Sequence, residues 1–309
     1  MYLDVNYVNK IGFIDLEINS NIDLVQEINK LKKEKNAIIL AHYYQNNDIQ
    51  DIADFIGDSL ALSQKVETID NDLIVFCGVH FMAETTKILS PSKKVLIPDL
   101  NAGCSLADSC KYEEFLDFKK KYPNHKVITY VNTTAEIKSI SDVCCTSSNA
   151  IQIVNSFDKD QNLIFAPDYN LGSYIKSVTG RENIVLWEGG CHVHQQFSIK
   201  NIVELKTKYP NAKIIAHPEC KKQVLIMADF IGSTAELLKY VSSSNEKEFI
   251  VVTEPGIIHQ MIKNEKNKIF LSPKPDSIDC GCNDCSYMKL ITLKKLYLTL
   301  KYELPEIKL

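Results

Sequence analysis

The chain repeats itself three times, and this repetition constrains its fold more than any other feature. Similar segments begin at Ile38, Lys126 and Lys213, which are 88 and 87 residues apart. The same offsets align a second block without a gap: Ala53–Ser59, Ser141–Ser147 and Ala228–Thr234. A period that stays constant over two separate blocks indicates one structural unit present in three copies.

Each copy alternates runs of β-branched residues with helical stretches, which is typical of a parallel sheet covered by helices. In the first copy we expect strands at 37–41, 54–56, 73–77 and 94–97, and helices at 48–53, 60–67 and 81–89. The third strand recurs at 163–166 and 249–253, and the fourth at 183–186 and 268–271. We therefore predict an α/β fold of three homologous three-layer αβα sandwich domains with small parallel sheets.

The repeat also predicts the domain boundaries. The first domain should span 1–105, the second 106–192 and the third 193–285. Residues 1–20 are expected to be an irregular lead-in, followed by a helix from about Ile22 to Lys35 capped by Asn21 or Ser20. The apolar spacing within 286–309 predicts a final helix that packs back on the first domain.

Charge and hydropathy exclude several classes of protein. Asp and Glu total 39 against 35 for Lys and Arg, so no cationic field attracts nucleic acid. The longest apolar run, 73–83, is shorter than the about 20 residues of a membrane span. The N-terminus lacks the features of a secretory signal, so we expect a cytoplasmic, reducing location. Arg181 is the one arginine, so bound anions must be held mainly by other groups.

Polar side chains recur at the predicted ends of the first strands. His42, Tyr130 and His217 occupy equivalent positions, and Tyr44, Asn132 and Glu219 follow two residues later. Ligands of parallel α/β sheets bind beyond the carboxyl ends of the strands, where loops converge. A histidine at a strand end can also be a merely hydrogen-bonded core residue, but repetition in all three copies favours a site.

Hydroxyl side chains recur where the second helix of each copy should begin. These positions are Ser59, Ser147 and Thr234, preceded by Asp58, Thr146 and Ser233. Such residues commonly cap their own helix. In a chain with so little arginine, three helix N-termini on one side of the sheets also predict binding of phosphate or carboxylate.

One cysteine-containing loop follows the fourth strand of each copy. The first loop contains Cys104, the second Cys191, and the third Cys280, Cys282 and Cys285. If the three domains form a triangle with pseudo-threefold symmetry, one thiol from each approaches the centre. Three thiolates could hold zinc with a fourth ligand, or three corners of a [4Fe-4S] cluster with one iron left open.

We expect the other cysteines to be structural residues or inert small hydrophobes rather than ligands. They are Cys77, Cys110, Cys144, Cys145 and Cys220.

From Ile38 to Leu300 the sequence resembles the quinolinate synthase family of bacterial NAD biosynthesis. The motifs that carry the resemblance are Ala41–Gln45, Ile56–Ser59, Asn101–Asp108, Tyr130–Glu136, Cys145–Asn149, Trp187–His194, Ala216–Cys220, Gly232–Thr234 and Cys285–Met288. The resemblance implies three α/β sandwiches in a triangle around a [4Fe-4S] cluster. It also implies a transferase that condenses iminoaspartate with dihydroxyacetone phosphate to quinolinate, releasing phosphate and two waters.

The resemblance assigns roles residue by residue. Cys104, Cys191 and Cys285 match the cluster ligands, while the roles of Cys280 and Cys282 stay open because the family varies there. The open iron would act as a Lewis acid. Tyr44 and Glu219 would move protons, and His42 and His217 would act beside them at the reacting centre. The positions that match the family's substrate site are His42, Tyr44, Ser59, Tyr130, Asn132, Ser147, His192, His217, Glu219, Ser233 and Thr234.

The resemblance also implies an enzyme that supplies iminoaspartate by oxidising aspartate. The alternative enzyme class keeps the three-cysteine cluster but makes it redox-active, as in the reductive dehydroxylase of isoprenoid synthesis. A zinc-stabilised protein that binds small anions at the same strand ends is the non-enzymatic alternative.

Overall fold

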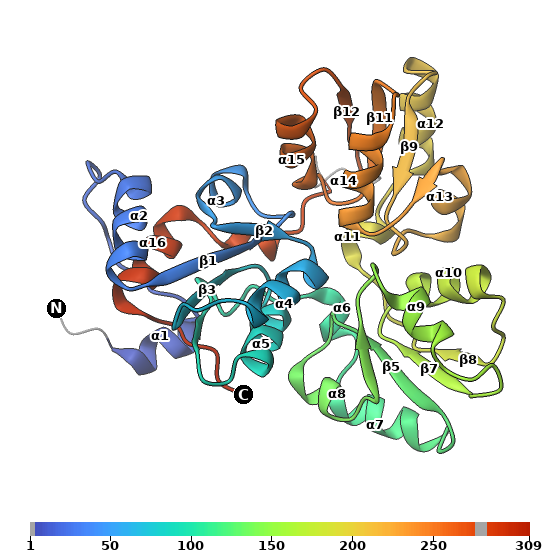
Figure 1. The fold of residues 1–309 in the computed structure, drawn as a ribbon, viewed down its shortest axis with the longest axis horizontal. Coiled ribbons are helices and arrows are strands. Elements are labelled where there is room, and N and C mark those ends of the chain that lie inside the picture. The colour runs from blue at the N-terminus through green and yellow to red at the C-terminus, as the bar shows by residue number, and fades with distance from the viewer. Residues whose placement is uncertain (1–3, 276–282) are drawn as a thin grey trace. The chain divides into compact units, whose positions relative to one another are not determined.

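The computed structural model describes residues 4–275 and 283–309, and its strands form three all-parallel sheets (Figure 1). The first has the order β2-β1-β3-β4 and contains β1 (Ala37–His42), β2 (Phe55–Gly57), β3 (Leu73–Cys77) and β4 (Lys94–Leu96). The second has the order β6-β5-β7-β8 and contains β5 (Lys126–Tyr130), β6 (Val143–Cys145), β7 (Leu163–Ala166) and β8 (Ile184–Leu186). The third has the order β10-β9-β11-β12 and contains β9 (Lys213–Ala216), β10 (Phe230–Ile231), β11 (Glu248–Val252) and β12 (Ile269–Leu271).

The chain forms two compact units. The first comprises Met1–Cys104 and Cys285–Leu309, and it holds the first sheet. Its helices are α1 (Val5–Ile11), α2 (Leu24–Glu34), α3 (Asn47–Ile52), α4 (Ser59–Glu67), α5 (His80–Leu89) and α16 (Leu293–Tyr302), with the 3-10 helix η1 (Met288–Leu290). As predicted, the final helix packs against this part of the chain, since α16 contacts α2.

The second unit, Ser105–Asp284, holds the other two sheets. Helices of its first half are α6 (Ser105–Asp108), α7 (Tyr112–Lys120), α8 (Ala135–Ser139), α9 (Ala150–Asn155) and α10 (Tyr169–Thr179). Helices of its second half are α11 (His192–Gln195), α12 (Ile199–Lys208), α13 (Lys222–Met227), α14 (Thr234–Ser243) and α15 (Ile257–Asn264). The α/β class and the three small parallel sheets with flanking helices are thus confirmed, whereas the finer domain boundaries stay a prediction.

The repeat extends to individual hydrogen bonds. A short edge strand directly follows an aspartate in each copy: Asp54, Asp142 and Asp229. Each aspartate bonds through its backbone and its carboxylate to the inner strand that comes first in its sheet along the chain. The carboxylates accept at 2.8 Å from the amides of Ile39, Val127 and Ile214, while the aspartate amides donate to the carbonyls of the same three residues. A carboxylate with a charge-assisted bond of this kind fixes the register of the edge strand.

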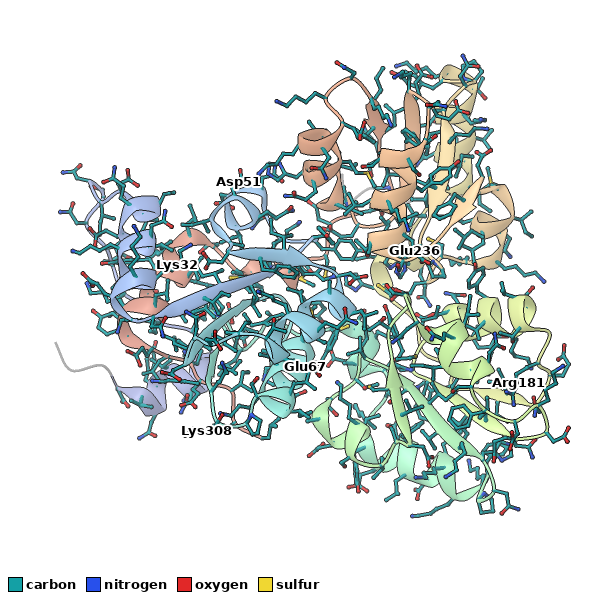
Figure 2. The ribbon with its side chains drawn as sticks, viewed as in Figure 1. Lys32, Asp51, Glu67, Arg181, Glu236 and Lys308 are labelled. Carbon is teal, nitrogen blue, oxygen red and sulfur yellow. The ribbon has the colours of Figure 1, made fainter. Side chains whose placement is uncertain are left out.

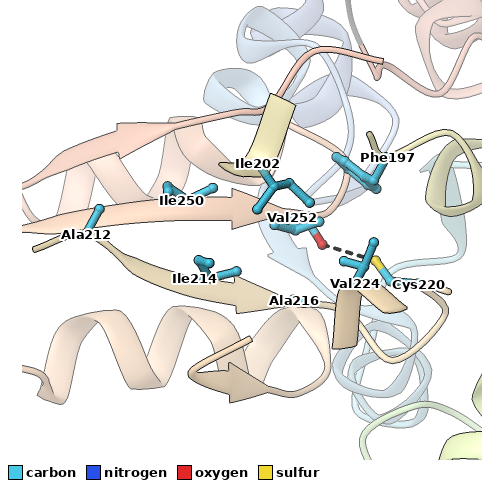
Figure 3. Packing of buried hydrophobic residues seen from close by; sticks show 9 residues of the cluster. All are labelled: Phe197, Ile202, Ala212, Ile214, Ala216, Cys220, Val224, Ile250 and Val252. Carbon is cyan, nitrogen blue, oxygen red and sulfur yellow. Dashed lines mark hydrogen bonds between the residues drawn. The ribbon is translucent and has the colours of Figure 1, made fainter. Parts of the chain in front are cut away.

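Apolar side chains on the inner strands of each sheet form the cores. Around the third sheet, nine buried residues from β9, β11, the flanking helices and the adjoining loops pack together (Figure 3). Cys220 belongs to this cluster, where its thiol donates to the carbonyl of Val252 at 3.4 Å. In the second sheet Cys110 packs against Phe115 and Ile164. The expectation that these two cysteines are core residues is therefore correct.

Four local expectations were wrong. A helix, α1, forms within the expected lead-in because the Asp4 carboxylate caps its first turn. The next helix begins at Leu24 with Asp23 as cap, not Asn21 or Ser20. In the second copy α9 begins at Ala150 rather than Ser147, since the Asn149 side chain accepts from the Thr146 amide and forms a turn first. Cys144 is exposed, because it lies on the edge strand β6.

In the part of the chain that the structure describes, no helix has the length and apolar character needed to cross a membrane.

Arg181, the single arginine, lies in the second unit (Figure 2), where it binds backbone carbonyls. It is buried, and its guanidinium donates to five carbonyls: Val154, Phe157, Asp158, Lys159 and Gln161. Those carbonyls lie at the end of α9 and in the loop before β7. The expectation that bound anions are held by other groups is consistent with this arrangement, because the guanidinium donors already have partners.

We predict that Arg181→Lys lowers the free energy of unfolding by about 2 kcal/mol, because one ammonium group cannot replace a planar fork that serves five carbonyls. Chemical denaturation followed by circular dichroism measures the change. Lys120→Gln, at a fully exposed ion pair, is the control and should leave the midpoint unchanged. An Arg181→Lys midpoint equal to that of the unmodified chain would contradict the structural role.

Candidate functional site

The second unit gathers titratable side chains where β5 and β9 end. Tyr130 is the last residue of β5, and His217 and Glu219 follow β9 directly. All three are buried, with exposed fractions of 5% or less. Because both strands are parallel members of their sheets, their carboxyl ends present these side chains together with the loops that follow.

Glu219 is the centre of this cluster. Its carboxylate accepts a hydrogen bond from the Tyr130 hydroxyl, and its Oε2 lies 2.8 Å from Nδ1 of His194. Burial by itself would raise the pKa of Glu219, but the nearby His194 and His217 rings and these two hydrogen bonds lower it to about 2. The structure therefore holds an ionised carboxylate inside the protein, which requires close hydrogen-bond donors.

His194 connects this carboxylate to a cysteine. Its Nδ1 lies 3.2 Å from Sγ of Cys191, and its Nε2 lies 2.9 Å from the Thr253 hydroxyl. Since Nδ1 faces an ionised oxygen, that nitrogen carries a proton. The Sγ of Cys191, a ring nitrogen of His194 and an oxygen of Glu219 all lie within 4.8 Å of one another, so together they could hold a metal ion.

His217 is oriented by its own loop. Its Nδ1 accepts from the amide of Glu219 at 3.4 Å, and its Nε2 lies 3.2 Å from the Ser147 hydroxyl. In the first unit the equivalent pair has the same geometry, since Nδ1 of His42 accepts from the Tyr44 amide at 3.1 Å. The orientation of the histidine ring is therefore the same in the first and third copies.

The first unit places Tyr44 beside the segment that follows Cys285. The Lys289 ammonium donates to the Tyr44 carbonyl at 2.7 Å, and the Gln45 amide donates to the Met288 sulfur at 3.5 Å. Gly103, next to Cys104, lies against the Tyr287 ring, since a Cβ added there would be 3.4 Å from it. The loops that contain Cys104 and Cys285 are therefore neighbours within this unit.

The cysteines differ in their suitability as ligands. Cys104, Cys191 and Cys285 are partly exposed. By contrast, burial raises the pKa of Cys77, Cys145 and Cys220, and burial together with Glu114 raises that of Cys110 to about 12. Because the thiolate is the metal-binding form, the three predicted ligands fit a metal centre better than these four thiols do. Cys280 and Cys282 lie outside the described residues.

Other predicted site residues have identified partners. His192 lies 2.7 Å from the Ser105 hydroxyl through Nδ1, and burial and His194 lower its pKa. Ser233 caps α14 in a capping box with Glu236, and Thr234 is buried as the first residue of that helix. Ser59 is the first residue of α4, whose cap is the Asp58 side chain.

Asn132 carries a buried side-chain oxygen that has no hydrogen-bond partner among the described residues. An unsatisfied buried acceptor costs about 1–3 kcal/mol, so a ligand that donates a hydrogen bond to it would be favoured.

Sequence reasoning missed two buried groups in this cluster. His194 was available as a signal, because it stands three residues after Cys191, a spacing that brings both onto one side of a helical turn. Asp168 gave no comparable signal. Burial, and after it the charge of Glu219, raises the pKa of Asp168.

Comparison with known proteins gives consistent matches. The family model described as Quinolinate synthetase A protein matches residues 26–309. The quinolinate synthase of Synechocystis sp. is 60% identical over 287 residues, covering 93% of this chain and 90% of that protein. The quinolinate synthase of Microcystis aeruginosa is 60% identical over 285 residues, covering 92% of this chain and 89% of that protein.

Among solved structures, the E-1-hydroxy-2-methyl-but-2-enyl-4-diphosphate reductase of Plasmodium falciparum is 13% identical with a TM-score of 0.34. It covers 91% of this chain and 93% of that one. Similarity at this level carries no inference about fold or function.

We predict that His194→Phe lowers the free energy of unfolding by about 3 kcal/mol, because it leaves the Glu219 carboxylate buried without the ring nitrogen that lies 2.8 Å from it. The double variant His194→Phe with Glu219→Gln should recover part of that loss, since no buried charge remains. Urea denaturation of the metal-free protein measures both. Additive losses in the double variant would contradict the coupling.

Proposed function

Because the chain belongs to the quinolinate synthetase A family, we propose that it condenses iminoaspartate with dihydroxyacetone phosphate to form quinolinate, phosphate and two waters. The similarity to proteins named quinolinate synthase over more than nine tenths of the chain is the observation that carries this proposal. The two substrates together contain the atoms of the three products, so the reaction needs no oxidant or reductant. A separate enzyme that oxidises aspartate is the proposed source of iminoaspartate.

We propose that Cys104, Cys191 and Cys285 hold a [4Fe-4S] cluster, one from each repeat. Their partial exposure, against the burial of four other thiols, supports this choice. Ser105 and His192, which directly follow Cys104 and Cys191 in the sequence, are hydrogen-bonded to each other, and the Cys104 and Cys285 loops adjoin. A cluster with one iron free of protein ligands supplies a Lewis acid for dehydration.

Glu219 is the proposed acid and base in the second unit. It is ionised, and the Tyr130 hydroxyl and the His194 ring hold its carboxylate in place, so it can accept a proton without first changing its orientation. The second ring nitrogen of His194, Nε2, lies against the Thr253 hydroxyl, so His194 links Glu219 to Thr253. Tyr44, at the equivalent position of the first repeat, is the proposed partner in proton transfer.

The remaining predicted residues would bind and orient the substrates. Ser59, Ser147, Ser233 and Thr234 stand at or before helix N-termini, where amide groups favour phosphate and carboxylate oxygens. Asn132 offers an unsatisfied acceptor to a substrate hydroxyl or imine N–H. His42, His192 and His217 would orient the intermediates.

The most direct test is an anaerobic assay of the intact, iron-reconstituted protein for quinolinate, with iminoaspartate generated in the reaction mixture and dihydroxyacetone phosphate added. Quinolinate should form together with equimolar phosphate and without consumption of a reductant. No quinolinate from an iron-loaded protein would refute the proposed activity. Turnover that depended stoichiometrically on a reductant would favour the redox-active alternative.

We predict that Cys104→Ala, Cys191→Ala and Cys285→Ala each abolish quinolinate formation and deplete the bound iron, because a cluster cannot be retained on two thiolates. Cys110→Ala is the control and should retain both, since its thiol is a core group. Iron and acid-labile sulfide analysis measures the loss. Full iron content in Cys191→Ala would refute the ligand assignment, and zinc in place of iron in the unmodified protein would favour the Cys191, His194 and Glu219 set as a zinc site.

We predict that Tyr44→Phe and Glu219→Gln retain the iron yet lower kcat by at least about 100-fold, the usual contribution of a positioned acid or base. Each change keeps the shape of the side chain and removes its exchangeable proton or its charge. Steady-state assays at matched iron content measure the effect. Normal turnover in either variant would remove that residue from proton transfer.

A further inference from the structure

The first turn of α10 lies between the loop that carries Cys191 and the loop that carries Glu219. On one side, the Tyr169 amide donates to the carbonyl of Gly189 at 2.9 Å, two residues before Cys191. On the other side, the Asn170 side-chain amide donates to the carbonyl of Glu219 at 3.1 Å. One helical turn from the second sheet thus contacts a proposed ligand loop and the proposed base of the neighbouring sheet.

Asp168 is the cap of this turn, and it is unlike an ordinary cap. It is fully buried, and its Oδ1 accepts from the Leu171 amide at 2.7 Å. Its Oδ2 has no hydrogen-bond partner among the described residues. Burial and then Glu219 raise the pKa of this carboxyl, against the backbone amides of Leu171, Cys191 and Asn170, which lower it. Burying such a group next to another carboxyl costs stability that a cap alone does not require.

The Cys191 loop has little freedom to move away from this turn. Gly189 pairs with Asp168 in a parallel bridge. A Cβ added at Gly189 would lie 2.4 Å from the carbonyl of Pro167 and 2.4 Å from the Ser109 hydroxyl. Backbone atoms of the β7–α10 connection therefore fix the loop. A substitution of the Asp168 carboxyl consequently affects the Cys191 amide, because the loop cannot move away from it.

We propose that Asp168 is a positioning residue whose buried carboxyl, together with Asn170, holds the Cys191 loop and Glu219 at a fixed distance from each other. The proposal rests on the proposed function in one respect, because it takes Cys191 as a ligand and Glu219 as the base. Asp168 itself touches neither substrate nor cluster; it acts through the backbone of Cys191, and Asn170 acts through the backbone of Glu219.

The conservative variant Asp168→Asn separates this role from capping. Asparagine caps helices as well as aspartate does, so its oxygen keeps the Leu171 bond and fold stability stays close to that of the unmodified chain. Its amino group takes the place of Oδ2, and the side chain can no longer carry the negative charge that the Cys191 amide favours. Asp23→Asn, at the exposed cap of α2, is the matched control.

The first measurement is the rate at which the anaerobic, iron-loaded protein releases iron to a ferrous chelator, together with its EPR spectrum. We expect release at least tenfold faster in Asp168→Asn with an altered spectrum, and no change in Asp23→Asn. For Asn170→Ala we expect unchanged iron release and a kcat at least tenfold lower, with KM within twofold. Iron release and spectrum in Asp168→Asn equal to those of the unmodified chain would overturn the proposal while leaving the proposed function intact.

A second measurement does not depend on the cluster. Hydrogen exchange of the Cys191 amide in the metal-free protein should be at least tenfold faster in Asp168→Asn than in the unmodified chain or Asp23→Asn. An unchanged exchange rate would overturn the proposal. If the unmodified protein bound no iron while this exchange rate rose as expected, the proposed function would fail and the positioning role of Asp168 would stand.

Discussion

The buried negative charge of Glu219 is the interaction on which the second unit depends. A carboxylate with 3% exposure is stable only if donors replace the water it has lost. Tyr130 from the second sheet and His194 from helix α11 provide those donors. The same charge thereby joins two sheets, orients His194 towards Cys191 and leaves an ionised group ready to accept a proton. The same hydrogen bonds to Glu219 therefore stabilise the fold and prepare the carboxylate for its proposed reaction.

The site results from one structural unit that is repeated three times and carries different side chains at equivalent positions. The three sheets have the same strand order, and an aspartate at the same place in each copy fixes the edge strand. The aim of the ring is also repeated at His42 and His217. What differs is the residue two positions later, where Tyr44, Asn132 and Glu219 give equivalent strand ends different acidities. A symmetric scaffold thus supports an asymmetric set of groups.

The sequence predicted most of the fold because the pattern that defines strands and helices is local. The strands 73–77 and 163–166 have the predicted bounds, since β-branched runs bounded by turns leave little choice. The expected start of α9 at Ser147 was wrong because the Asn149 side chain competes for the Thr146 amide, a contact that the period of the repeat does not encode. Helix α1 was missed because a single aspartate cap outweighed a weak apolar pattern.

The sequence predicted only those site residues whose residue type by itself indicates a chemical role. Cysteines in equivalent loops and polar strand ends stand out in the sequence. The partners that set their properties do not, because Asp168 and Thr253 meet Glu219 and His194 only after two sheets have formed.

The central claim is that Glu219 is ionised within this buried cluster. Infrared difference spectroscopy between the unmodified protein and Glu219→Gln at neutral pH tests it directly: a lost carboxylate band is the predicted result, and a lost band of a protonated carboxyl group would contradict the account.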